Sequence, residues 1–391
     1  MKLVKRGFVL TLAVLAAVFL LVTLRDRRQK ISVYENRTLA AHPAFSVQSL
    51  WDGSYFDGWD EYFADHVAWR DDLLRDYLWL QLYGKRQVII NDVVITDLTL
   101  LPNLGCHRDD SGLDFSVPAK AAADRLGNIQ QAVETYGGRF LFLGIDEQRT
   151  ALADAYPAYV YSRAEYYTAV ERAFRAAAAE RGLSVLFLRD LIQDADPASL
   201  YSKVDHHYNL RGAYLAYAAI CKWSADHGLA VTAIPEKALG IHPTEGMFYG
   251  SYSRKLYDLS PVQEQLLVFD ETVFPPYERW DNGEHTDAPL LELPSEGEPV
   301  QYHAYMGGDK GETVIRTNRP ELPNVLIVGD SFTNPVEALC TASFNELRSL
   351  DFRHYDAMTL TEYLAEYPAD LVVVIRDNLN YIGTEANGNL R

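Results

Sequence analysis

The chain has 391 residues and is strongly acidic, with 54 Asp and Glu against 36 Lys and Arg and a formal charge of −18 at pH 7. Residues 1–30 carry +6, so the remainder carries −24. A surface this acidic excludes nucleic acid and an anionic membrane face as the main partner, whereas a neutral or zwitterionic glycan stays open. The three cysteines, Cys106, Cys221 and Cys340, are too widely separated for a disulfide framework or a zinc pattern, and we expect buried thiols, of which one pair can still be oxidised.

Residues 1–30 predict a membrane anchor. An uncharged run of eighteen residues extends from Gly7 to Leu24 between two groups of basic residues, and it is just long enough to span a bilayer. A cleavable signal peptide has a shorter apolar stretch with a small-x-small site behind it, so we favour an uncleaved signal anchor over a signal peptide or a buried core helix. Because both flanks are basic, the positive-inside rule leaves the orientation open.

Residues 31–100 are rich in aromatic side chains and predict a mostly helical region that packs. The aromatic residues recur at steps of three and four, which places many of them on one helical face. An aromatic stripe binds sugar in some proteins, but here we expect a core. The stripe consists of Trp51, Tyr55, Phe56, Trp59, Tyr62 and Phe63.

From residue 101 to 391, helix-length and strand-length patterns alternate, which is typical of a doubly wound α/β domain with a parallel sheet. We expect the ligand cleft at the carboxyl ends of the strands, where Asp146, Ser331 and Arg376 fall. The expected helices cover 119–136, 161–181 and 210–227, and the expected strands cover 138–145, 183–188, 325–328 and 371–375.

Residues 235–323 interrupt this alternation with a segment rich in Gly, Pro, Tyr and acidic residues, which we interpret as a large insertion. It predicts an irregular β-rich subdomain at the rim of the site or, alternatively, a solvated region packed by its tyrosines. Two of its stretches, 250–255 and 302–305, combine hydroxyl, aromatic and basic groups that suit a sugar.

The segment 324–333 presents Ser331 as a candidate nucleophile. Its run Val325–Val328 predicts an interior parallel strand, and Gly329 permits the tight turn that follows. A serine at such a strand-to-helix junction lies beside unpaired backbone N–H groups, which can stabilise an oxyanion. Alternatively, Asp330 or Ser331 is simply a helix N-cap.

An Asp-His-His-Tyr element supplies the base that a serine nucleophile needs. On an extended stretch, residues two apart project to the same side, so Asp205 can orient the imidazole of His207 while His206 points the other way. His207 can then reach Ser331. The alternatives are a loop in which a histidine caps the following helix, or a metal pair with Asp205. Because no further cluster with ligand spacing accompanies the element, no metal is predicted.

Together these motifs resemble the DHHW family, which is similar to the SGNH-hydrolase-like domains of the alginate O-acetylation proteins. The matching stretches are spread over most of the chain. Tyr208 stands where the family name has Trp, and it keeps a large aromatic wall. The stretches are Glu35-Asn36-Arg37 with Pro43, Asp205 to Asn209, Tyr305 to Asp309, Gly329 to Phe332 and Leu350 to Tyr355.

The resemblance implies an α/β fold of the SGNH-hydrolase-like (flavodoxin-like) type, a three-layer sandwich with a parallel sheet, in which Asp205, His207 and Ser331 form a catalytic triad. Such a site would transfer an acetyl group to a hydroxyl of a cell-surface or extracellular polysaccharide through an acetyl-serine intermediate, without a cofactor. The resemblance further implies a single-pass protein of the cell membrane with its catalytic domain outside the cytoplasm, and a membrane-embedded acyltransferase as the acetyl donor.

By the same resemblance, Gly308, Asp309, Tyr305 and Arg353 are candidates for oxyanion or substrate contacts. Relatives often carry Asn where this chain has Asp309, and an ionised aspartate cannot donate a hydrogen bond to an oxyanion. Asp309 is therefore protonated, has another task or weakens catalysis, unless it merely closes an ordinary turn. Arg353 is a candidate electrostatic or acceptor-binding residue, with a surface salt bridge to Asp351 as the alternative.

Three functions stay open on these residues. The first is an O-acetyltransferase, and the second is a carbohydrate esterase that uses the same triad with water as the acceptor. The sequence cannot separate these two. The third is a non-catalytic glycan-binding or scaffold protein, which the aspartate at position 309 favours.

Overall fold

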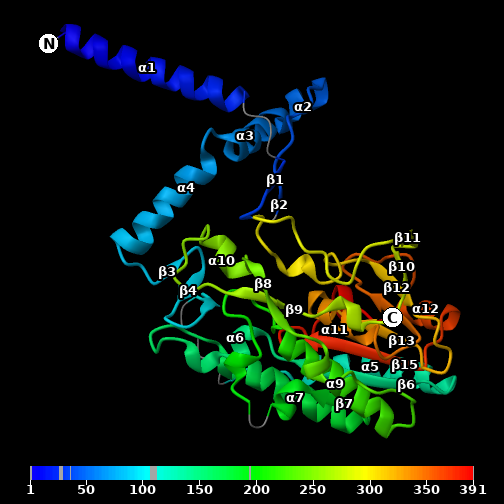
Figure 1. Ribbon diagram of the computed structural model, residues 1–391. Coiled ribbons are helices and arrows are strands. Elements are labelled where there is room, and N and C mark those ends of the chain that lie inside the picture. Colours follow the sequence, from blue (N-terminus) through cyan, green and yellow to red (C-terminus); the bar gives the residue numbers. More distant parts are fainter. Residues whose placement is uncertain (1, 26–29, 36, 106–111, 193–194, 391) are drawn as a thin grey trace. The chain divides into compact units, whose positions relative to one another are not determined.

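The computed structural model describes residues 2–25, 30–35, 37–105, 112–192 and 195–390. The chain divides into two compact units, one formed by 1–91 with 253–260 and the other by 92–252 with 261–391 (Figure 1). Cys221 and Cys340 are buried free thiols, as predicted. Cys106 and the motif residue Asn36 lie outside the described residues.

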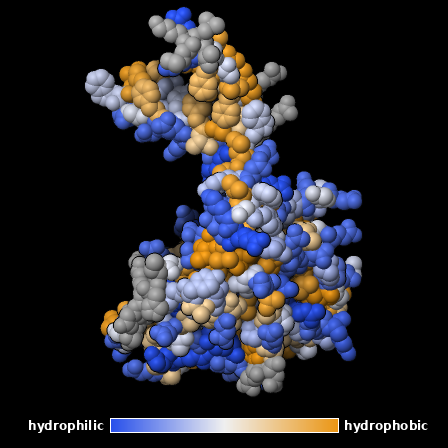
Figure 2. Space-filling view, turned by 90° about the vertical axis from the view of Figure 1, so that its left-hand side faces the viewer, coloured by the Kyte–Doolittle hydropathy of each residue, from blue (hydrophilic) through white to orange (hydrophobic). Residues whose placement is uncertain are grey.

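The first unit is mainly helical. Among the described residues, α1 is the one helix that is long and apolar enough to cross a membrane. The apolar stretch is Lys5–Thr23, and it is almost entirely exposed. Figure 2 shows exposed apolar side chains in orange in the upper part of the view. The elements are α1 (Lys2–Arg25), β1 (Ile31–Ser32), β2 (Arg37–Thr38), α2 (Val47–Asp52), α3 (Ser54–His66), α4 (Arg70–Trp79), η1 (Leu80–Gly84) and β3 (Ile89–Ile90).

Two ion pairs explain the first matching stretch of the sequence. Arg37 donates to both carboxylate oxygens of Asp65 on α3, at 2.7 and 2.5 Å, and this contact lowers the pKa of Asp65 to about 2. Glu35 accepts a hydrogen bond of 2.5 Å from Arg70 at the start of α4. The stretch therefore ties the segment after α1 to both α3 and α4.

The aromatic stripe is a core only in part. Tyr62 is buried, and Trp59 contacts it edge to face with ring centroids 5.7 Å apart. The prediction is wrong for Trp51 and Phe56, whose side chains are 93% and 57% exposed. Trp51 lies at the end of α2, a short helix with no buried residue, so nothing in its own helix covers the indole.

The second unit is built on a mixed eight-stranded sheet in the order β11-β10-β12-β14-β13-β15-β6-β7. The strands from β14 to β7 are parallel, and β12, β10 and β11 continue the sheet antiparallel. The predicted parallel sheet is thus present, and the insertion extends it by three strands. The bounds are β6 (Arg139–Ile145), β7 (Val185–Phe187), β10 (Glu278–Asp281), β11 (Glu284–Thr286), β12 (Glu312–Arg316), β13 (Val325–Val328), β14 (Glu346–Leu350) and β15 (Leu371–Asp377).

One face of the sheet is covered by α5, α7 and α12, whose apolar side chains form a core with alternate residues of β6, β13 and β15. Helix α9 packs against α11. The fold is α/β as predicted, and a three-layer sandwich of the SGNH type stays a prediction. The helices are α5 (Ser116–Thr135), α6 (Gln148–Ala151), α7 (Ala164–Arg181), α8 (Leu188–Leu191), α9 (Leu210–Asp226), α10 (Ser251–Lys255), α11 (Asn334–Cys340) and α12 (Leu360–Glu366), and the remaining strands are β4 (Val93–Ile95), β5 (Leu100–Pro102), β8 (His242–Met247) and β9 (Gln265–Val268).

Candidate active site

Ser331 lies at the carboxyl end of β13, in the middle of the sheet. Val328, the last residue of β13, pairs with Leu350 on β14 and with Val374 on β15. The chain then turns at Gly329, where a Cβ atom would lie only 2.9 Å from the carbonyl oxygen of Ile375, so the turn requires glycine. A buried apolar strand followed by glycine therefore brings the serine to the edge of the sheet where α/β proteins bind ligands.

Asp330, and not Ser331, caps the helical turn that follows. The Asp330 side chain accepts a hydrogen bond of 3.1 Å from the backbone N–H of Phe332. Ser331 is partly exposed, and its own N–H has no acceptor among the described residues. The serine hydroxyl is consequently available for another contact, and the N–H beside it can face an oxyanion.

The aspartate-histidine element lies on a bent loop. Tyr201 and Tyr208 form an antiparallel bridge that closes the loop, and Asn209 caps the N-terminus of α9 directly after it. Gln148 on α6 donates its backbone N–H to the carbonyl of His206 at 3.0 Å. The loop is thus held at both ends and in its middle.

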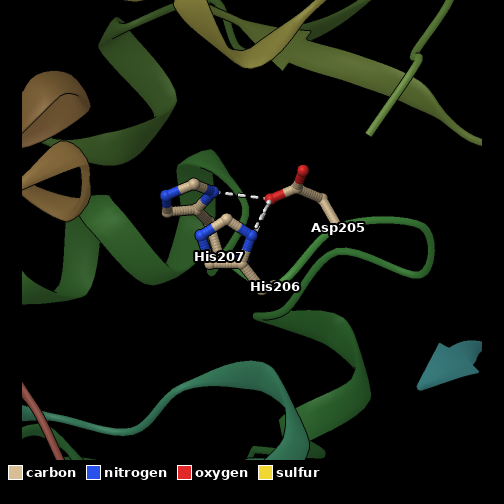
Figure 3. Close-up of side chains that lie close together, drawn as sticks. All are labelled: Asp205, His206 and His207. Carbon is tan, nitrogen blue, oxygen red and sulfur yellow. Dashed lines mark hydrogen bonds and ion pairs between the residues drawn. The ribbon is translucent and has the colours of Figure 1, made fainter. Parts of the chain in front are cut away.

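The loop and the end of β13 bring the three predicted triad residues together, joined by two consecutive hydrogen bonds. His207 Nδ1 lies 2.5 Å from Asp205 Oδ1, and His207 Nε2 lies 2.8 Å from Ser331 Oγ. Figure 3 shows the Asp205 carboxylate beside both histidine rings. When Nδ1 carries its proton toward Asp205, Nε2 is free to accept the proton of the serine hydroxyl.

Asp205 is buried, and three N–H groups surround its carboxylate. Two come from His207, and the third is the backbone N–H of Ser251, 2.6 Å from Asp205 Oδ2. Burial opposes the charge of Asp205, but the neighbouring histidines and these donors outweigh burial and hold the pKa of Asp205 well below its ordinary value. Asp205 is therefore an ionised partner for the imidazole.

Aromatic rings enclose the imidazole of His207. Tyr302 lies parallel to it at 3.7 Å between ring centroids, and Phe332 contacts it at 4.6 Å. The expectation that His206 points away is wrong, because the bent loop brings its ring to 3.8 Å from His207 and its Nδ1 to 3.5 Å from Asp205 Oδ1. His207 itself is only 3% exposed.

Asp309 and Arg353 lie close together near the strand ends. One Asp309 oxygen accepts from Asn334 at 2.9 Å, and the other accepts from Arg353 at 2.7 Å. Arg353 also binds Asp351, with three N–O distances between 2.5 and 3.0 Å. The salt bridge between Arg353 and Asp351 is thus present, and a role of Arg353 in binding the acceptor stays a prediction.

Gly308 and Tyr305 have local partners. Gly308 has a φ of +83°, which favours glycine, and its N–H donates to the carbonyl of Tyr305 at 3.1 Å. Tyr305 is 1% exposed, and its hydroxyl donates to the carbonyl of Leu267 within the insertion. In this structure neither group is free to contact an oxyanion or a substrate.

Within the part of the chain that the structure describes, two groups of histidine and carboxylate side chains lie close enough together to hold a metal ion. In the first, both ring nitrogens of His207 are already engaged. In the second, Arg353 already supplies a cation to both carboxylates. The groups are Asp205, His206 and His207, and Asp309, Asp351 and His354.

Sequence reasoning missed three residues that shape the site. Ser251 and Tyr302 come from the insertion, whose two sugar-suited stretches contain them but gave no sign of contact with Asp205 or His207. The insertion therefore contributes to the site and also packs through its tyrosines. Gln148 lies two residues after the predicted strand end at Asp146, and this position was the one available signal for it.

No family model and no curated protein matches the sequence. Among solved structures, Bacillus cereus PatB1 with a sulfonyl adduct is similar at a TM-score of 0.60 and 17% identity, over 76% of this chain and 98% of that chain. A DHHW family protein from Eubacterium siraeum is similar at a TM-score of 0.54 and 18% identity, over 77% of this chain and 95% of that chain. The O-acetyltransferase domain of Pseudomonas putida AlgJ is a more distant likeness, with a TM-score of 0.45 and 12% identity over 74% of this chain and 92% of that chain. The resemblance to DHHW proteins is confirmed, and at these identities it concerns the fold.

Proposed function

We propose that this protein is an O-acetyltransferase that modifies a cell-surface or extracellular polysaccharide through an acetyl-Ser331 intermediate. The observation that carries the proposal is the continuous line from the Asp205 carboxylate through His207 to the hydroxyl of Ser331. Its support from outside the site is the likeness to PatB1, which was solved with a sulfonyl adduct, since sulfonyl compounds react with activated nucleophiles.

The reaction has two balanced steps. In the first, Ser331 Oγ attacks the acetyl carbonyl carbon of the donor while its proton passes to His207 Nε2. The bond to the leaving group breaks, and Nε2 returns the proton to that group. In the second step a sugar hydroxyl gives its proton to His207 and attacks the acetyl-serine, and Ser331 Oγ leaves with that proton. Asp205 stabilises the imidazolium present between the transfers.

The proposal places the protein at the cell membrane. The apolar stretch Lys5–Thr23 would be a single-pass anchor, with the second unit outside the cytoplasm. An acetyl donor on the same membrane, such as a membrane-embedded acyltransferase, would then lie within reach of the site.

The test is acetyl transfer by the full-length protein in detergent, with p-nitrophenyl acetate as donor and neutral oligosaccharides as acceptors. Mass spectrometry of the products distinguishes acetylated oligosaccharide from free acetate. We expect acetylated product with the wild type and none with Ser331→Ala. If free acetate is the only product, the protein is an esterase and not a transferase. If both proteins are folded and equally inactive, the proposal that this protein is an enzyme is contradicted.

A further inference from the structure

We propose that Tyr302 is a positioning residue, whose ring holds the imidazole of His207 in the plane that serves both Asp205 and Ser331. This inference rests on the proposed function, because it assigns a task to a side chain outside the triad. The geometry points to Tyr302 among the three rings around His207. Its ring is inclined by only 6° to the imidazole, whereas those of His206 and Phe332 are inclined by 37° and 60°.

The parallel ring of Tyr302, 3.7 Å from the imidazole, restricts the rotation of His207 that would break its hydrogen bonds to Asp205 and Ser331. Rotation of the imidazole about its Cβ–Cγ bond would carry Nε2 away from Ser331 and Nδ1 away from Asp205. With Tyr302 stacked on the imidazole and the centroid of the His206 ring also only 3.8 Å away, the turning ring would collide with both neighbours. The stack therefore limits His207 to the orientation in which both hydrogen bonds form.

The stack also favours the charged form of the imidazole. During acyl transfer His207 holds the serine proton and becomes a cation, and the face of a neutral phenol ring attracts a cation. Burial raises the pKa of Tyr302 well above its ordinary value, so the phenol stays neutral. The attraction is thus present in the state that the reaction forms.

The ring of Tyr302 is firmly mounted. Tyr302 begins the helical turn η6 (Tyr302–Ala304), and the carbonyl of Ala304 accepts a hydrogen bond of 2.8 Å from Glu292. Tyr305, directly after the turn, is buried and contacts the Tyr302 ring edge to face at 5.3 Å. The anchored turn and the contact with Tyr305 hold the ring of Tyr302 in place, so that it can position the imidazole that lies on it.

The hydroxyl of Tyr302 is not part of this task. It is buried and has no hydrogen-bond partner among the described residues. Removing it with Tyr302→Phe keeps the stack, whereas Tyr302→Leu keeps apolar volume and removes the aromatic face. These two variants separate the ring from the hydroxyl.

The experiment measures how fast phenylmethylsulfonyl fluoride modifies Ser331 in the full-length protein, by intact mass. In this reaction an Oγ–S bond forms, the S–F bond breaks, fluoride leaves and His207 takes the serine proton. We expect Tyr302→Phe to react as fast as the wild type and Tyr302→Leu to react about tenfold more slowly, the size of a stacking and cation–π contribution. With p-nitrophenyl acetate, the same loss should appear in kcat with KM unchanged.

Thermal unfolding accompanies each measurement, and Tyr302→Met replaces Tyr302→Leu if the latter does not fold. Tyr305→Phe, which removes a buried hydrogen bond from the same segment, controls for general loosening. A folded Tyr302→Leu that reacts at the wild-type rate overturns the inference, and so does a Tyr302→Phe as slow as Tyr302→Leu. If the wild type itself is not modified at Ser331, the proposed function fails and this inference fails with it.

Discussion

Replacing Asp205 by asparagine changes one carboxylate oxygen into an NH₂ group at nearly constant shape. In the structure the two oxygens accept from His207 Nδ1 at 2.5 Å, from His207 N at 3.0 Å and from Ser251 N at 2.6 Å. An amide offers a single oxygen, so in either orientation at least one buried N–H group faces another donor.

The size of the effect depends on that orientation. If the amide oxygen faces His207, the N–H of Ser251 loses its acceptor, which costs about 1–3 kcal/mol of the free energy of unfolding. If the NH₂ group faces His207, it favours the tautomer with the proton on Nε2, which cannot take the proton of Ser331. Such a change in a serine triad lowers kcat by about 10⁴-fold. We therefore expect Asp205→Asn to lose activity by about 10²- to 10⁴-fold.

The assay is hydrolysis of p-nitrophenyl acetate by the full-length protein, with urea unfolding measured alongside. Asp190→Asn is the matched control, since the Asp190 side chain is 54% exposed and its one ion pair among the described residues is with Arg175. An Asp205→Asn protein that is as active as this control would refute the role of Asp205 in orienting His207.

Three further predictions follow from buried polar groups. Gln148→Leu should lower the free energy of unfolding by about 2–4 kcal/mol, because three buried acceptors share the two N–H groups of its Nε2, and an unchanged urea midpoint would contradict this. Tyr208→Phe should cost about 1 kcal/mol in the same assay, because the carbonyl of Phe332 loses a buried donor. Burial and the nearby Asp377 raise the pKa of Asp330 to about 6. The folded state then binds this proton more tightly than the unfolded state, whose pKa is about 3.9, so stability falls as pH rises from about 4 to 6. Asp330→Asn cannot ionise and should therefore be more stable than wild type above about pH 7 by about 2–3 kcal/mol, with no difference near pH 4, and a pH-independent difference would contradict this.

Many helices and strands of the second unit could be predicted, because a helix buried on one face shows periodic apolar residues and a fully buried strand shows a continuous apolar run. The predicted strand 325–328 coincides with β13, all four residues of which are buried. The strand β14 was missed because its sequence, Glu-Leu-Arg-Ser-Leu, contains polar residues that the fold buries. Arg348 is buried together with partners such as Glu346 and Tyr363, which accept its hydrogen bonds, and these partners cannot be inferred from local sequence.

The part of the candidate site that lies in short sequence motifs could be predicted. The prediction that Asp205, His207 and Ser331 lie together needs only two short segments of sequence. Ser251 and Tyr302 could not be predicted, because they reach the motif from a long insertion whose course depends on tertiary packing. The position of His206 was wrong because the bridge between Tyr201 and Tyr208 bends a loop that the spacing alone treats as extended.

If Ser331 carries the acetyl group during the reaction, the acetyl-serine intermediate can be trapped. Full-length wild type and Ser331→Ala are mixed with p-nitrophenyl acetate, quenched in acid and analysed by intact mass and peptide mapping. We expect one acetyl group on the peptide that contains Ser331 in the wild type, and no acetyl group at that position in the variant. A wild type that turns over the ester while Ser331 stays unmodified, or a variant that turns it over equally fast, would contradict the acetyl-serine intermediate.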